Sequence, residues 1–106
     1  MQELSAFQRD VLFIIAGSET PHGLAIKDEL EQYYSAAVNH GRLYPNLDEL
    51  VDAGLLTKGE VDGRTNKYDL TPKAEQYLQR RLHWELDRAD VDLDDAAVSD
   101  SASCGR

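Results

Sequence analysis

The chain has 106 residues, of which 20 are acidic and 11 basic, so its formal net charge is −9. This length suffices for one small domain with a single core and excludes two. No apolar run approaches the roughly 18 residues of a membrane span. We expect neither a span nor a secretory signal, and hence a cytoplasmic protein. The single cysteine, Cys104, excludes an intramolecular disulfide and a metal site built on several cysteines.

The acidity of the chain bears on its partners. Such a chain would ordinarily bind nucleic acid poorly, because phosphate contacts depend on lysine and arginine. The same acidity is expected of a protein that works in a cytoplasm close to salt saturation, where charges are screened within about 3 Å at about 1 M salt. In that case the net charge reflects the habitat more than the partner.

Two helices are predicted in the first third of the chain. Ser5 and Gln8 have the spacing of a capping box, and the apolar residues after them predict a helix over about residues 5–16. Turn signals begin at Gly17. Apolar side chains then recur every three or four positions over residues 23–34, which predicts a second helix.

Two further helices and a hairpin are predicted after these. Asn39 is expected to cap a third helix, which contains regularly spaced leucines and stops at Gly54. "LLTKGEV" and "NKYDL" then read as strands on either side of "DGRT", whose Asp-Gly pair is a hairpin turn signal. Thr71 and Pro72 begin a fourth helix, over about residues 72–89.

The last 17 residues differ in composition from the rest. Residues 90–106 contain five aspartates and one arginine, with no sustained period, and predict an acidic, disordered tail. Residues 1–89 are then the domain, with the fourth helix available for dimerisation. Removing the tail would still leave this domain acidic.

Three helices, a hairpin and a fourth helix predict a mainly α fold with a small β-hairpin, in the order of a winged helix-turn-helix. The second and third helices form the helix-turn-helix, and the hairpin forms the wing. Because such domains also serve as protein docking modules, the fold alone does not establish DNA binding. Individual residues must support that function.

Donors and acceptors gather at the start of the predicted third helix: Asn39, His40, Arg42, Tyr44 and Asn46. In this fold the first turns of that helix meet base edges in the major groove. Arg42 can bond guanine bidentately, and Asn46 can read adenine. The alternative for Tyr44 is partial packing in the core, and for His40 it is a neutral residue of the first turn.

The predicted wing tip collects polar and basic side chains in a chain otherwise short of positive charge: Arg64, Thr65, Asn66 and Lys67. We expect contacts to phosphates or the minor groove there, the alternative being a solvated surface. Lys27, on the second helix, is a weaker candidate for a phosphate contact. His22, in the turn before that helix, is expected to be structural.

Two blocks of sequence have the order and spacing of a known pair of motifs. They read "HGRLYPNLDELVDAGLL" and "DGRTNKYDLTPKAEQYL", and they resemble the PadR-like family of winged-helix transcriptional regulators. The matched positions are Gly41, Leu43, Tyr44, Pro45, Leu47, Leu50, Gly54 and Leu55, then Gly63, Arg64, Lys67, Tyr68, Leu70, Thr71 and Pro72. The resemblance implies a homodimeric repressor or regulator that binds a pseudo-palindromic operator in double-stranded DNA.

One departure from the family concerns charge. Members often carry basic residues after the Leu-Tyr-Pro sequence, whereas this chain has Asp48 and Glu49 there. This fits a halophilic member, in which K⁺ or Na⁺ ions accumulate between the carboxylates and the phosphates. Affinity for DNA is then expected to hold or rise with KCl, in contrast to ordinary counterion release.

A second departure is that one helix follows the wing, without the long C-terminal region of larger members. Dimerisation is therefore expected to use the fourth helix, together with the first. The apolar residues that form the predicted seam are Tyr77, Leu78, Leu82, Trp84 and Leu86. Paired helices of this kind would set the two recognition helices about 34 Å apart, near one turn of DNA.

Pro45 lies inside the predicted third helix, where its ring crowds the carbonyl of Gly41. Because it is close to the end with free backbone groups, it should cost less than a proline in a helix interior. We predict a locally bent or widened first turn, which aims Arg42, Tyr44 and Asn46 toward DNA.

The main alternative function is a winged-helix module that docks on basic proteins of the transcription machinery without reading sequence. An enzyme is not expected, because the sequence has neither a catalytic constellation nor metal-ligand spacing, and no cofactor is predicted. Alanine at Arg42 and Arg64 distinguishes the two hypotheses, because DNA binding that survives both changes would be incompatible with direct readout by this surface.

Overall fold

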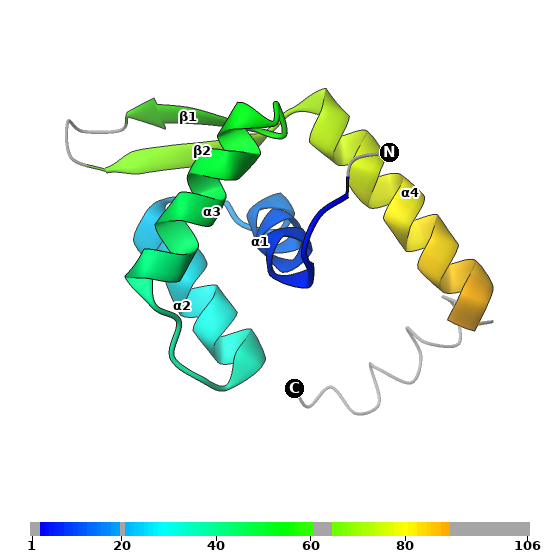
Figure 1. Ribbon diagram of the computed structural model, residues 1–106, viewed down its shortest axis with the longest axis horizontal. Helices are drawn as coiled ribbons and strands as arrows, with labels where there is room; N and C mark the ends of the chain where they lie inside the picture. The colour runs from blue at the N-terminus through cyan, green and yellow to red at the C-terminus, as the bar shows by residue number, and fades with distance from the viewer. Residues whose placement is uncertain (1–2, 20, 61–64, 90–106) are drawn as a thin grey trace.

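The computed structural model describes residues 3–19, 21–60 and 65–89, and it has four helices and a hairpin in the predicted order (Figure 1). The elements are α1 (Ala6–Ala16), α2 (Gly23–Tyr34), α3 (His40–Asp52), β1 (Leu56–Glu60), β2 (Asn66–Leu70) and α4 (Pro72–Ala89). The predicted fold class, mainly α with a small antiparallel hairpin, is confirmed. The predicted tail and the hairpin turn fall on residues 90–106 and 61–64, which lie outside the described residues.

The beginnings of α1 and α3 show how local sequence sets the helix bounds. The Ser5 hydroxyl accepts from the Gln8 backbone N–H, and the Gln8 side chain accepts from the Ser5 backbone N–H, which completes the predicted capping box. Asn39 caps α3 as predicted, through its side-chain oxygen. Its backbone carbonyl accepts from the N–H groups of both Arg42 and Leu43, each at 3.0 Å.

The turn at Asn39 corrects the prediction for Pro45. We expected a bent or widened first turn, but the Asn39 carbonyl accepts both a three-residue bond from Arg42 and the ordinary four-residue bond from Leu43, so the first turn is not widened. The helix assignment runs through Pro45 from His40 to Asp52. Pro45 therefore does not interrupt the helix, and the bond that it lacks is the one to the Gly41 carbonyl.

The hairpin is joined by a short segment before α2. β1 and β2 pair antiparallel, with Leu56 opposite Leu70. His22 forms an isolated bridge with Lys67, and the Tyr68 N–H donates to the Pro21 carbonyl at 2.9 Å. No local sequence signal predicts this pairing, which anchors the middle of β2 to the segment before α2.

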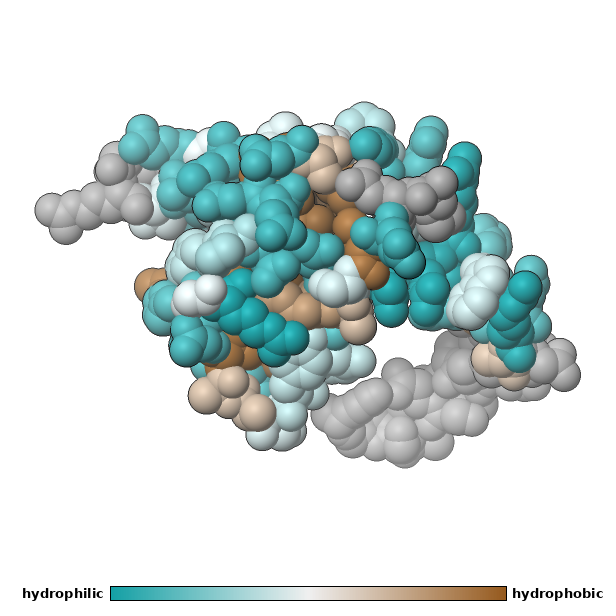
Figure 2. Space-filling model, viewed as in Figure 1, coloured by the Kyte–Doolittle hydropathy of each residue, from teal (hydrophilic) through white to brown (hydrophobic). Residues whose placement is uncertain are grey.

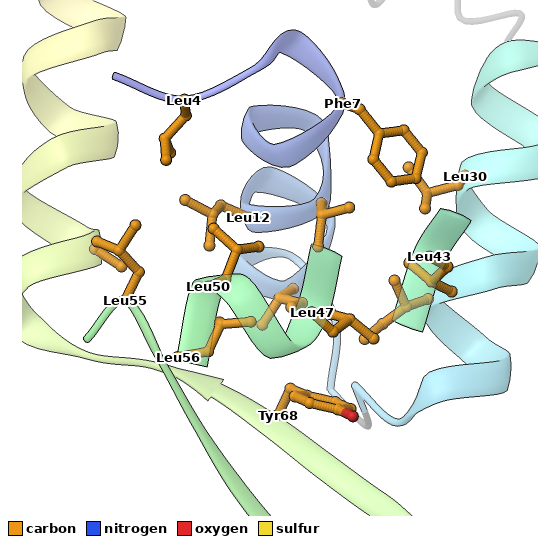
Figure 3. Packing of buried hydrophobic residues seen from close by; sticks show 14 of the residues in the cluster. Leu4, Phe7, Leu12, Leu30, Leu43, Leu47, Leu50, Leu55, Leu56 and Tyr68 are labelled. Atoms are coloured by element: carbon orange, nitrogen blue, oxygen red, sulfur yellow. The ribbon is translucent and has the colours of Figure 1, made fainter. Parts of the chain in front are cut away.

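The core lies between α1, α3 and the hairpin (Figure 3). Leu12, Leu43 and Leu47 are completely buried, and Tyr68 of β2 is 1% exposed. Each buried leucine contributes roughly 1.5–3 kcal/mol relative to an exposed position. Since α3 supplies Leu43 and Leu47, together with Leu50, which is 1% exposed, its apolar stripe holds the opposite, polar face outward.

α4 divides into an inner half, residues 72–78, and an outer half, residues 79–89. This division corrects part of the predicted dimer seam. Tyr77 and Leu78 are 8% and 6% exposed, because they pack in the core of a single chain. Leu82 and Trp84 are 44% and 46% exposed, and Leu86 is half-buried. Figure 1 shows the outer half of α4 extending away from the other helices. The apolar side chains of α4 that remain exposed, and so are available to a second copy, therefore begin after Leu78.

Among the described residues, no helix is both long and apolar enough to cross a membrane.

Candidate nucleic-acid interface

The exposed face of α3 carries the predicted reading residues at its N-terminal half. A shallow depression there is lined by Asn39, Gly41, Arg42, Pro45 and Asn46. Hydrophilic residues cover most of the face of the molecule on which α3 lies (Figure 2). The structure thus brings Asn39, Arg42 and Asn46 together on one accessible surface.

Arg42 lies against α1. Its guanidinium carbon is 4.0 Å from the centroid of the Phe7 ring, a cation–π arrangement. Phe7 is buried and stacks in turn on Tyr34, with 6.3 Å between ring centroids. The Arg42 side chain is exposed as a whole, so its donors remain within reach of a ligand, but the guanidinium group lies toward the start of α1.

Asn46 is held by polar partners on two helices. Its Nδ2 donates to the Arg42 carbonyl at 2.7 Å, and its Oδ1 accepts from Gln8 Nε2 at 3.0 Å. Gln8 Nε2 also donates to Glu49 Oε1 at 3.0 Å. The sequence analysis treated Gln8 only as a helix cap. Its second role depends on a contact across 38 residues, for which the sequence carries no local signal.

Tyr44 packs inward, as the alternative for this residue proposed. It is half-buried against the core, and its ring lies so close to Gly23 that a Cβ there would be 2.9 Å from Tyr44 Cε1. His40 stacks on Tyr44, with centroids 5.5 Å apart and the ring planes at 12°. The expectation that Tyr44 is aimed outward is therefore wrong, because its ring fills the space that Gly23 leaves between α2 and α3.

Lys27 forms an ion pair with Glu31, one turn further along α2. Its Nζ is 2.9 Å from Glu31 Oε2, and the same carboxylate oxygen accepts from the Val38 N–H at 2.8 Å. These hydrogen bonds, the Val38 bond first, lower the pKa of Glu31 below its ordinary value. Glu31 thereby holds the turn that leads into α3.

His22 has the structural role that was expected. As the N-cap of α2, its Nδ1 accepts from the Ala25 N–H at 3.4 Å. It also forms the bridge to Lys67 of β2. His22 therefore connects the start of α2 to the hairpin.

The hairpin places basic residues next to acidic ones. Lys67 Nζ is 3.9 Å from Asp69 Oδ1, and both side chains are largely exposed. Thr65 and Asn66 are half-buried at the start of β2. Arg64, which the sequence analysis placed at the wing tip, lies outside the described residues.

Lys58 was not predicted as part of the interface. It lies on β1, opposite Tyr68 in the register, and its Nζ is 3.8 Å from Asp48 Oδ1 on α3. The pair joins the wing to the recognition helix. A signal was available, since Lys58 is a basic residue in the middle of the predicted first strand, but its partner is set by the packing of β1 on α3.

Taken together, α2, α3 and the hairpin form a winged helix-turn-helix with a polar recognition helix whose basic neighbours are paired with carboxylates. The sequence matches the PadR-like family of transcriptional regulators over residues 11–80. The chain belongs to this family, as its two motif blocks indicated.

Solved structures agree with this assignment. RosR of Halobacterium salinarum, in crystals grown from NaBr, is 44% identical, with a TM-score of 0.84 and coverage of 97% of each chain. A PadR-like transcription factor from Bacteroides fragilis is 24% identical, with a TM-score of 0.65, and the match covers 78% of this chain and 84% of that one. A winged-helix DNA-binding protein from STIV is 16% identical over 80% of this chain and 92% of that one, with a TM-score of 0.66. The last two show the fold alone. None of the curated proteins compared with this chain matches it.

Proposed function

We propose that this PadR-like regulator is a sequence-specific DNA-binding repressor that occupies a pseudo-palindromic operator as a homodimer, in a cytoplasm of high salt. The observation that carries the proposal is the open polar face of α3 beside the hairpin. The Lys58–Asp48 pair links the two elements, so that the helix and the wing approach a duplex from the same side.

The adaptation to high salt is inferred from where the carboxylates lie. Asp48 and Glu49 are exposed on α3, the helix that also carries Arg42. Phosphates brought to this face would meet carboxylates as well as basic groups, so K⁺ or Na⁺ ions are needed between them. The similarity to a protein of Halobacterium salinarum supports this inference.

The homodimer is inferred from the apolar surface on α1 and the outer half of α4. Phe13 is 38% exposed and, with Leu70 and Leu82, lines a hollow of about 440 Å³ between these elements. The Trp84 ring contacts the guanidinium groups of Arg81 and Arg88, whose central carbons are 4.6 and 4.7 Å from its centroid. A self-complementary interface of this kind gives the two-fold symmetry that a palindromic operator requires.

The distribution of charge also favours α4 over α3 as the surface where two copies associate. α4 carries four basic side chains, Lys73, Arg80, Arg81 and Arg88, against three acidic ones, Glu75, Glu85 and Asp87. α3, by contrast, carries one arginine against three acidic side chains. Two copies of an acidic chain repel each other least where their surfaces are not acidic.

A selection experiment tests the proposed function. Wild-type protein is incubated at molar KCl with a duplex library that has a randomised central segment, and the bound DNA is sequenced. We expect one enriched palindromic motif. Arg42→Ala is expected to lose about 10- to 100-fold in affinity for that motif, the cost of a bidentate base contact.

Arg64→Ala distinguishes a phosphate contact from base readout, because it should weaken binding to all sequences alike. A protein docking module predicts a different result. If no motif is enriched, or if both alanine variants bind the motif as well as the wild type does, direct readout by this surface is wrong.

A further inference from the structure

The Gln8 side chain, on the first turn of α1, is hydrogen-bonded at both ends. Its Oε1 accepts from the Ser5 N–H at 3.2 Å, the bond that completes the capping box. Its Nε2 donates to Asn46 Oδ1 and to Glu49 Oε1, each at 3.0 Å. One side chain therefore connects the start of α1 to the exposed face of α3.

These bonds determine the direction of the Asn46 amide. Because Nδ2 donates to the Arg42 carbonyl, Oδ1 is the atom that faces Gln8 Nε2. A half-turn of the amide would place Nδ2 against Gln8 Nε2, a donor against a donor. An amide has two donor hydrogens and an oxygen with two lone pairs, so each end of Asn46 keeps one position for a further partner.

We propose that Gln8 is a positioning residue for base readout, which fixes the order in which Asn46 presents its acceptor and its donor to a base pair. This inference rests on the proposed function. Asparagine reads adenine by accepting from N6 and donating to N7, so a reversed amide no longer matches the same edge in the same place. The neighbouring Phe7 holds Arg42, and thus one turn of α1 orients both candidate base-reading side chains.

Gln8→Glu separates this role from the capping role. A glutamate at position 8 still accepts from the Ser5 N–H, since Ser-x-x-Glu is itself a capping box, so α1 begins as before. The substitution replaces the Nε2 donor by an acceptor, and Asn46 must turn its Nδ2 toward the new carboxylate. Because that carboxylate also faces Glu49, the variant is made together with Glu49→Gln, and Glu49→Gln alone is the matched control.

The experiment compares base preferences in the same duplex-library selection at molar KCl. The wild type, Glu49→Gln, Gln8→Glu with Glu49→Gln, and Asn46→Ala are each selected, and their melting temperatures are measured. Because Glu49→Gln removes one carboxylate of the proposed interface, we expect it to change overall affinity and its salt dependence but not the order of base preferences, and the double variant is compared with it rather than with the wild type. We expect the double variant to lose about ten-fold in preference at the base pair that Asn46→Ala identifies, and at no other, with an unchanged melting temperature.

In a protein that already carries Asn46→Ala and Glu49→Gln, adding Gln8→Glu should not change the base preference any further, because Gln8 acts on that preference through Asn46. If the wild type enriches a motif and the double variant enriches the same motif with equal strength, Gln8 does not position Asn46 and this inference is wrong, while the proposed function stands. A loss of preference spread evenly over the motif also overturns it. If the wild type enriches no motif, the proposed function fails and this inference fails with it.

Discussion

The exposed face of α3 and the outer half of α4 are both open to solvent, but they differ in what occupies their side chains. On α3 the polar groups are already bonded: Asn46 to Gln8, Asp48 to Lys58 and Glu49 to Gln8. On α4 beyond Leu78, the apolar side chains of Leu82 and Trp84 remain largely exposed. A surface whose groups are held in place suits recognition of a fixed pattern, whereas exposed apolar area suits association with a second copy.

Substitutions on the two surfaces should also have different effects. Substitutions on α4 should act on assembly and leave the single chain folded. Substitutions around α3 should act on orientation and on salt dependence.

Leu82→Glu should abolish the dimer. Leu82 is 44% exposed, so the charge costs the folded monomer little, whereas in the proposed seam it would be buried without a partner. Loss of the second half-site should lower operator affinity by about 100-fold or more. Analytical ultracentrifugation with and without DNA measures both quantities.

Leu24→Glu is the matched control for this variant, since Leu24 is 61% exposed on α2, away from the proposed seam. It should remain dimeric. If Leu82→Glu is dimeric as well, α4 is not the dimer surface.

Gly23→Ala should destabilise the junction of α2 and α3. A Cβ at this position would lie 2.9 Å from Tyr44 Cε1, so the tyrosine ring must move. Overpacking of this kind typically costs about 1–3 kcal/mol, although alanine is otherwise the better helix residue. Urea unfolding measures the change. In a Tyr44→Ala background the same substitution should be neutral or stabilising, and an equal loss in both backgrounds would contradict the contact.

Tyr34 gives the fold a dependence on alkaline pH. Burial and the hydrogen bond that its hydroxyl donates to Asp10 raise its pKa from 10 to about 12. In the unfolded chain the tyrosine ionises near pH 10, while in the folded chain it keeps its proton. The free energy of unfolding should therefore fall as the pH rises from about 10 toward 12.

Tyr34→Phe should make this alkaline decline shallower. Tyr68, whose pKa burial also raises, still contributes a decline in the same direction. Urea unfolding at a series of alkaline pH values checks the slope, and identical slopes for the variant and the wild type would argue against a raised pKa at Tyr34.

Asp48→Asn should have the smallest effect on the free energy of unfolding of the substitutions considered. Its main effect should be on the salt dependence of operator binding. The pair with Lys58 is 3.8 Å long and exposed, so its loss costs at most about 1 kcal/mol. The freed lysine can then contact a phosphate, which should lower the slope of log operator affinity against log KCl concentration by about one. A KCl titration of affinity measures the slope, and an unchanged slope would show that Lys58 makes no such contact.

How far the sequence predicts this molecule depends on the distance over which each signal acts. Capping residues such as Ser5 and Asn39 act within one turn, and the helix bounds that they predict agree with the structure. The extent of the proposed dimer seam follows less well from the sequence, because helical spacing shows that Tyr77, Leu78 and Leu82 lie near one stripe but not where the body of the domain ends along it.

The candidate site shows the same limit. Its location on α3 and the hairpin follows from motifs, but the partners of its side chains depend on how distant elements pack. Gln8 with Asn46 and Lys58 with Asp48 are contacts between elements, so no local pattern marks them. The turn at Asn39 was mispredicted because the proline was considered without the backbone bonds around it.

The affinity of the wild-type protein for its selected duplex, measured from low to molar KCl, tests the central claim most directly. That claim is that α3 reads DNA across a surface whose carboxylates require bound cations. We predict that the affinity holds or rises as KCl approaches molar concentration. A steep, uniform loss of affinity with rising salt, as for an ordinary basic DNA-binding protein, would contradict it.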